Sequence, residues 1–256
     1  MSQNDSYLWS QSLVLKHKNA FPTGCSPRRL TSGAIAVAIC LATSAASETA
    51  TSSEQLPSTV NETLLDWSGL YARGILGFGV GNYGGALDGG TSDYPSDGEG
   101  RLDGEAFGVA AGYNLQSGNS IYGAELDLMK TNNAGSENCG NPSFSCNFEV
   151  DAIASFSGRF GYLAQDSLMV YGSAGFALAT TTAFTEGPVD TAADADMTGY
   201  VLGVGLEYGI SDRISLRASA KHFEFGDQDY VISEIPETAT IQTNMTRIEM
   251  GLIYHF

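Results

Sequence analysis

The residues of this sequence that most resemble catalytic machinery are His222 and Glu224, two positions apart near the end of an alternating segment. Alternate residues of an extended chain point to the same side, so an imidazole and a carboxylate would stand together and could exchange protons in a hydrolysis. No serine stands at a suitable spacing to act as the nucleophile. Because a polar pair at a strand end is also an ordinary structural feature, we expect no enzymatic activity and no catalytic residue.

Two cysteines, Cys139 and Cys146, lie in a polar segment that spans residues 131–147. Paired cysteines are typical of exported loops, so these two are predicted to form a disulfide bond. Metal binding is the alternative, but no histidine lies near them, and we expect neither a metal nor a cofactor. The other two cysteines, Cys25 and Cys40, fall in the leader described below.

Acidic residues gather in two further polar segments and could hold divalent cations. They are Asp88, Asp93, Asp97, Glu99, Asp103, Asp190, Asp194 and Asp196. Their spacing differs from that of a calcium-binding loop, so solvated acidic loops are the favoured interpretation.

The composition limits the partners and the fold class. The formal charge is -17 with only 12 Lys and Arg, which argues against nucleic acid as a partner because phosphates require clustered basic residues. Charged residues make up 16% of the chain, against about 25% in ordinary soluble domains. Outside the leader, no run of apolar residues is long enough for a transmembrane helix.

Residues 1–46 have the three-part layout of a secretory signal peptide with an extended basic region. The basic residues 16, 18, 28 and 29 precede an apolar run over 30–41, and small residues follow. We expect cleavage after Ala46, with Ser47 as the second choice. A lipoprotein site at Cys40 is less favoured, because Ile39 stands where a small residue is expected. Residues 47–65 are polar and predict a flexible periplasmic lead-in.

The remaining residues, 66–256, alternate between apolar and small or polar side chains in eight segments, which indicates strands. The segments are about 70–80, 106–115, 121–130, 151–162, 168–178, 200–208, 214–221 and 244–256. Long connections (82–104, 131–147, 180–197 and 226–240) alternate with short turns. This pattern predicts an eight-stranded antiparallel up-and-down transmembrane β-barrel in the outer membrane, with extracellular long loops and periplasmic termini.

Nine charged residues share the second face of these strands with Gly, Ser and Ala. They are Arg73, Glu125, Asp127, Arg159, Glu207, Arg217, Lys221, Arg247 and Glu249. A soluble barrel or β-sandwich would instead need large apolar side chains inside and charges outside. The interior of an eight-stranded barrel is narrow, so these charges are predicted to pair across the lumen; a channel lining is the alternative. Aromatic residues at the turn side of the apolar face indicate a membrane interface.

Four stretches carry a resemblance to a known family: DWSGLYARGILGFGVG, GRFGYLAQDSLMVYGSAGFALA, GYVLGVGLEYGISDRISLRASAKHFEFGD and RIEMGLIYHF. In this order they resemble the small outer-membrane β-barrel proteins of alphaproteobacteria, of porin-like or opacity type and related in fold to the OmpA membrane domain. The ending with Tyr254 and Phe256 resembles the signal read by the barrel-assembly machinery.

The resemblance implies a role in envelope integrity and surface interaction, and it supplies no catalytic residues. Outer-membrane lipids, lipopolysaccharide, the barrel-assembly machinery and a host or surface ligand on the loops are the expected partners. A small low-conductance porin is the main alternative function. A barrel enzyme that modifies lipid A through His222 is the less favoured one.

Overall fold

The computed structural model describes residues 66–87, 92–139, 141–188, 190–232 and 237–256. These residues belong to one compact unit, Ser58–Phe256. The predicted signal peptide, the lead-in, Cys25, Cys40 and Asp88 lie outside the described residues. Among the described residues, no helix is long and apolar enough to cross a membrane.

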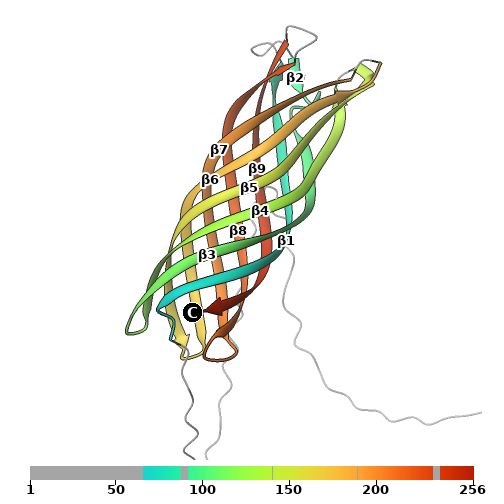
Figure 1. The fold of residues 1–256 in the computed structure, drawn as a ribbon. Helices are drawn as coiled ribbons and strands as arrows, with labels where there is room; N and C mark the ends of the chain where they lie inside the picture. The colour runs from blue at the N-terminus through green and yellow to red at the C-terminus, as the bar shows by residue number, and fades with distance from the viewer. Residues whose placement is uncertain (1–65, 88–91, 140, 189, 233–236) are drawn as a thin grey trace, which may run out of the picture. The chain divides into compact units, whose positions relative to one another are not determined.

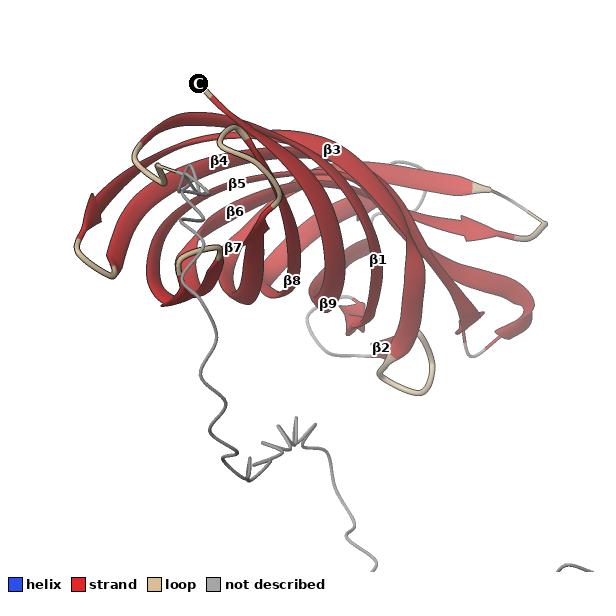
Figure 2. Ribbon diagram, turned by 90° about the horizontal axis from the view of Figure 1, so that it is seen from below, coloured by secondary structure: helices blue, strands red, loops and turns tan. Residues whose placement is uncertain are grey.

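The described residues form one antiparallel sheet (Figure 1). Its strands are β1 Gly69–Leu87, β2 Ser92–Tyr94, β3 Gly100–Ser117, β4 Ser120–Cys139, β5 Asn141–Gln165, β6 Leu168–Glu186, β7 Thr191–Gly209, β8 Ile214–Ile232 and β9 Glu237–His255. The strands follow one another around the sheet, and β9 pairs with β1, so that β1 and β3 to β9 close into an eight-stranded ring. Figure 2 shows these strands curving around one interior. The predicted fold class is confirmed.

The short turns are built as the sequence predicts. Ser117 pairs with Ser120, so Gly118 and Asn119 alone connect β3 to β4. Gly118 has a φ of 58°, a left-handed conformation that glycine adopts at no steric cost in tight hairpins. We call the end of the barrel with such turns the short-turn end and the opposite end the long-hairpin end.

The long connections are a correction to the sequence prediction. The ring strands run for 18 to 25 residues, and most of the segments predicted as loops continue the strands. Residues 131–147, for example, form the arms of a β4–β5 hairpin that stays paired as far as Cys139 and Asn141. The short strand β2, which pairs with Gly85–Leu87 of β1, was not predicted.

The reason for this error is visible in β7. Within the predicted strand the outward residues are apolar, as at Leu202, and the inward ones are small or charged, as at Glu207. Beyond it the polarity is reversed: Asp194 points outward while Met197 is buried inside. The apolar outer face therefore covers only part of β7. A prediction based on that face misses the part of the strand that contains Asp194.

The register of the ring sets the width of its interior. Following paired residues once around from Ala72 in β1 leads back to β1 at Asn82, ten residues further along. A stagger of this kind with eight strands gives an interior about wide enough to be filled by side chains. The ring therefore encloses a packed core.

Candidate functional site: the filled lumen and the outer wall

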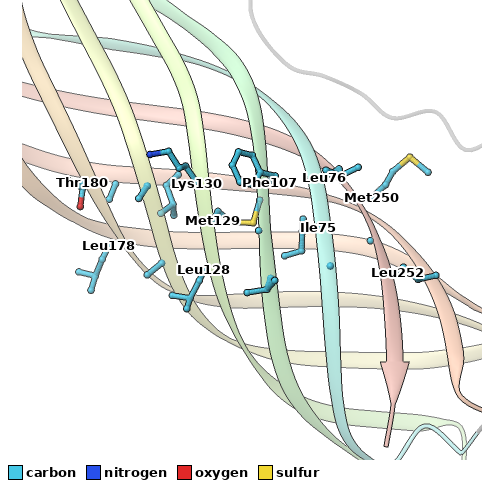
Figure 3. A pocket seen from close by; sticks show the side chains of 18 of the residues that line it. Ile75, Leu76, Phe107, Leu128, Met129, Lys130, Leu178, Thr180, Met250 and Leu252 are labelled. Carbon is cyan, nitrogen blue, oxygen red and sulfur yellow. The ribbon is translucent and has the colours of Figure 1, made fainter.

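The outer wall carries a continuous apolar band. Its residues come from every strand of the ring and include Leu76, Val109, Leu128, Phe156, Phe176, Leu202, Leu216 and Met250, all solvent-exposed. Figure 3 shows Leu128, Leu178 and Leu252 on this wall, with Lys130 and Thr180 where the band gives way to polar residues. We call this surface the apolar band.

Aromatic residues mark the edge of the apolar band at the short-turn end. The exposed residues there are Tyr113, Tyr122, Phe160, Tyr162, Tyr208 and Tyr254. The rings of Tyr122 and Phe160 contact each other at 5.3 Å between centroids, and those of Tyr254 and Phe256 at 5.2 Å. The backbone N–H of Phe256 donates a hydrogen bond to the carbonyl of Leu70, so the last residue is tied to the first ring strand. The assembly role of Tyr254 and Phe256 stays a prediction.

The lumen contains all nine of the charged residues singled out in the sequence. Each is buried, and together they form one connected ion-pair layer. Arg73 in β1 contacts three carboxylates, those of Glu125 at 2.9 Å, Asp127 at 2.6 Å and Glu249 at 3.2 Å. Because these side chains come from β1, β4 and β9, the network joins strands that are not all neighbours.

Further ion pairs cross the full width of the lumen. Lys221 Nζ in β8 lies 2.7 Å from Asp127 Oδ2 in β4, and Arg217 in β8 pairs with Glu125 in β4. Three strands separate β4 from β8 in either direction around the ring, so these strands stand opposite each other. Side chains of these opposite strands therefore contact each other directly across the interior.

Two tyrosines that sequence reasoning missed complete this layer. The guanidinium of Arg159 lies 4.5 Å from the ring centroid of Tyr171 and 5.6 Å from that of Tyr71, and Arg217 contacts the same two rings. Such cation–π contacts stabilise desolvated guanidinium groups. The Tyr71 hydroxyl also donates a 2.7 Å hydrogen bond to Glu125. The alternation of the strand already indicated that Tyr71 points inward, since it shares its strand face with Arg73.

Glycine makes room for these rings. A Cβ at Gly205 would lie 2.6 Å from the ring of Tyr171, and one at Gly112 would overlap the ring of Tyr71. Small residues on the inward face therefore position the large ones.

Apolar clusters cover the ion-pair layer on both sides. At the short-turn end the cluster is Trp67, Ile121, Leu163, Met169 and Tyr171. At the long-hairpin end a larger one, which we call the hairpin core, includes Tyr83, Tyr94, Phe148, Met197, Phe223, Phe225, Tyr230, Ile241 and Met245. The lumen thus has apolar, ionic and apolar layers in succession.

Strand β2 contributes Tyr94 to the hairpin core. The Tyr94 hydroxyl lies within hydrogen-bonding distance of two backbone carbonyls, those of Asn147 in β5 at 2.8 Å and Phe184 in β6 at 3.2 Å. Burial raises the pKa of the Tyr94 phenol above its ordinary value. The neighbouring Tyr83 donates to the carbonyl of Cys146 at 2.9 Å. The Tyr94 hydroxyl thus ties β2 to β5 and β6, and the Tyr83 hydroxyl ties β1 to β5.

The structure joins Cys139 and Cys146 by a disulfide bond across the β4–β5 hairpin. Cys146 is buried in the hairpin core, and the backbone N–H of Ser96 donates to the carbonyl of Asn138 next to Cys139. The disulfide therefore lies where the β1–β3 connection contacts the hairpin.

His222 and Glu224 lie together on the outer wall, about 44% and 40% exposed, with 3.4 Å between His222 Nε2 and Glu224 Oε2. The other ring nitrogen of His222 is 2.9 Å from the hydroxyl of Thr246 in β9. They stand at the edge of the apolar band on the side of the long hairpins.

Those acidic residues of the predicted loops that the structure describes also lie on the outer wall or in connections. Thr180 donates to Asp196 at 3.0 Å, and Thr182 lies within hydrogen-bonding distance of Asp194 and Asp151. In the part of the chain that the structure describes, no group of three or more metal-ligating side chains is arranged to hold a metal ion.

A closed ring of antiparallel strands with an apolar outer band defines a membrane-spanning β-barrel, because closure pairs every backbone group within the hydrocarbon. The chain belongs to the outer membrane protein beta-barrel domain family, whose model matches residues 34–256. It is therefore an outer-membrane protein.

Individual proteins are similar to this chain. The chain is 29% identical over 237 residues to the 31 kDa outer-membrane immunogenic protein of Brucella melitensis, covering 86% of this chain and 97% of that protein. It is 26% identical over 188 residues to the 22 kDa outer membrane protein of Rhizobium leguminosarum, covering 73% and 77% respectively. Among solved structures, Neisserial surface protein A matches with a TM-score of 0.44 and 14% identity, over 74% of this chain and 98% of that one.

Proposed function

We propose that this protein is a closed, non-enzymatic barrel that stabilises the outer membrane and presents its long hairpins at the cell surface. The observation that carries the proposal is the contact between opposite strands in the ion-pair layer, Lys221 with Asp127 and Arg217 with Glu125. A lumen spanned by buried ion pairs and covered by apolar clusters on both sides offers no path for hydrated solutes.

The proposed orientation places the long-hairpin end outside the cell and Phe256 on the periplasmic side. Barrels of this class typically have short periplasmic turns and longer extracellular connections. Outside the apolar band the long hairpins carry acidic side chains such as Asp194 and Asp196, which suit a hydrated surface beside lipopolysaccharide headgroups. The Brucella relative is named as an immunogenic protein, which is compatible with surface exposure.

Planar-bilayer recording tests closure directly and separates the proposal from a low-conductance porin. We expect protein purified from outer membranes to give no discrete conductance steps, while a general porin in the same bilayer serves as the positive control. Reproducible steps that scale with the amount of inserted protein would contradict the closed lumen.

A separate measurement addresses catalysis. Mass spectrometry of lipid A from cells with the wild-type chain and from cells with His222→Ala should give the same acylation pattern. Loss of an acyl chain only in the wild-type cells would assign an enzymatic role to His222 and refute the non-enzymatic proposal.

A further inference from the structure

The charges inside the lumen do not balance. Among the described residues, the buried ion-pair layer holds five cationic side chains, Arg73, Arg159, Arg217, Lys221 and Arg247. It holds four carboxylates, those of Glu125, Asp127, Glu207 and Glu249. With His255 counted as neutral, one positive charge is in excess. An uncompensated charge in a desolvated interior is costly, so the layer requires a further negative charge.

Arg247 is the cation with the fewest partners. Arg73, Arg159, Arg217 and Lys221 each contact two or three different carboxylates. Within the described part of the chain, Arg247 contacts a single carboxylate, that of Glu249 at 2.8 Å. That carboxylate is shared with Arg73 at 3.2 Å and with Lys221 at 3.9 Å. The excess charge is therefore least compensated at Arg247.

The surroundings of Arg247 also leave its positive charge poorly compensated. The side chain is fully buried, and its Nη1 has no hydrogen-bond partner among the described residues. The guanidinium lies 4.6 Å from the ring centroid of Phe223, so an aromatic face replaces a polar partner on one side. Arg247 is also directly opposite Lys221 across the β8–β9 pair, and two like charges in that position are destabilising.

We infer that the lumen binds one small monovalent inorganic anion, such as chloride, against Nη1 of Arg247. The excess of one positive charge sets the charge of the ligand, and the burial of Arg247 excludes a bulky one. The ion would accept the hydrogen bond that Nη1 lacks and would reduce the repulsion between Arg247 and Lys221.

Bromide is the probe for the site itself. Crystals of protein purified from outer membranes and grown with bromide in place of chloride should show an anomalous peak within hydrogen-bonding distance of Arg247 Nη1. No such peak there, or peaks only beside exposed cations such as Arg101, would mean an adventitious ion only and would overturn the inference. This measurement needs no variant.

Thermal unfolding tests whether the ion contributes to stability. When chloride replaces gluconate stepwise at constant ionic strength, the Tm should rise with the logarithm of chloride concentration, because a ligand that binds only the folded state stabilises it by mass action. Arg247→Met leaves four cations facing four carboxylates, so this variant should fold and lose the chloride dependence. The exposed-site control Arg101→Met should keep it. A chloride dependence that survives in Arg247→Met would place the ion elsewhere and refute the site.

Discussion

Lys221 and Asp127 are 94 positions apart in the sequence, yet their side chains meet 2.7 Å apart in the middle of the lumen. Their strands, β8 and β4, stand on opposite sides of the ring. The contact links the two halves of the barrel wall through its interior, in addition to the backbone hydrogen bonds that link neighbouring strands. The stability of the barrel should therefore depend on its internal charges.

Glu125 is the carboxylate shared by the most cations, since it contacts Arg73, Arg159, Arg217 and Lys221. Glu125→Gln removes a negative charge from a layer that already has excess positive charge. We expect a loss of about 3–5 kcal/mol in the free energy of unfolding, measured by urea titration of protein refolded in detergent. The matched control is Glu105→Gln, at an exposed outer position. It should change the free energy of unfolding by less than about 0.5 kcal/mol. Equal effects of the two variants would contradict a buried network.

Tyr94 should anchor the β1–β3 connection through its hydroxyl. Tyr94→Phe removes the single hydroxyl donor that lies near the carbonyls of Asn147 and Phe184 but keeps the ring in the hairpin core. We expect a cost of about 1–3 kcal/mol, because the buried carbonyl of Asn147 loses its nearest hydroxyl donor. Hydrogen exchange should show faster exchange at residues 92–94 with little change in the apolar band. Unchanged exchange in β2 would mean that the ring alone holds the connection.

The disulfide is predicted to be complete in the outer membrane. Thiol labelling of denatured, unreduced protein should leave Cys139 and Cys146 unmodified, and labelling after reduction should modify both. A cysteine that reacts without reduction would contradict the pairing.

The apolar band should tolerate charge poorly. Phe176, in β6, is 76% exposed on this band, so Phe176→Arg would place a charge in the hydrocarbon at a cost of about 2–4 kcal/mol near the midplane. Val231 is exposed to a similar degree, at 66%, but lies on the extension of β8 beyond the band. Val231→Arg should therefore assemble normally in cells. The readout is the amount of folded barrel in outer membranes, separated from unfolded protein by its faster migration in unheated gels.

The predicted processing remains to be measured. Mass spectrometry of the protein from outer membranes should give an amino terminus at Ser47, with Glu48 as the second choice. A lipid-modified Cys40 would show instead that the leader directs lipoprotein processing.

Much of the barrel follows from periodicity alone. Alternation with a period of two assigns each residue to a face, so the inward position of Arg73 and the outward position of Leu76 can be read directly from the sequence. The ion-pair partners of each charged residue cannot be read from the sequence. Whether Lys221 reaches Asp127 depends on the stagger of the whole ring, which is the sum of every strand register and is fixed by no local pattern.

The hairpin core was missed for a related reason. Tyr230 lies in a segment predicted as a polar loop, 226–240, while Phe148 and Val150 lie between the predicted loop 131–147 and the predicted strand 151–162; the acidic neighbours Glu149, Asp151 and Asp229 interrupt the apolar outer face there. Tyr94 was missed because a strand of three residues is too short to show a period.

The reversal of polarity along β7 also fixes the depth at which the barrel sits in the bilayer. A shift of the barrel toward the short-turn end would draw Asp194 and Asp196 into hydrocarbon, while a shift the other way would expose Tyr200 and Leu202 to water. Both displacements are unfavourable, so the barrel has one favoured depth along the membrane normal. The height of the long hairpins above the lipid headgroups is then a fixed property of the sequence, and lengthening or shortening a hairpin would change its reach without moving the barrel.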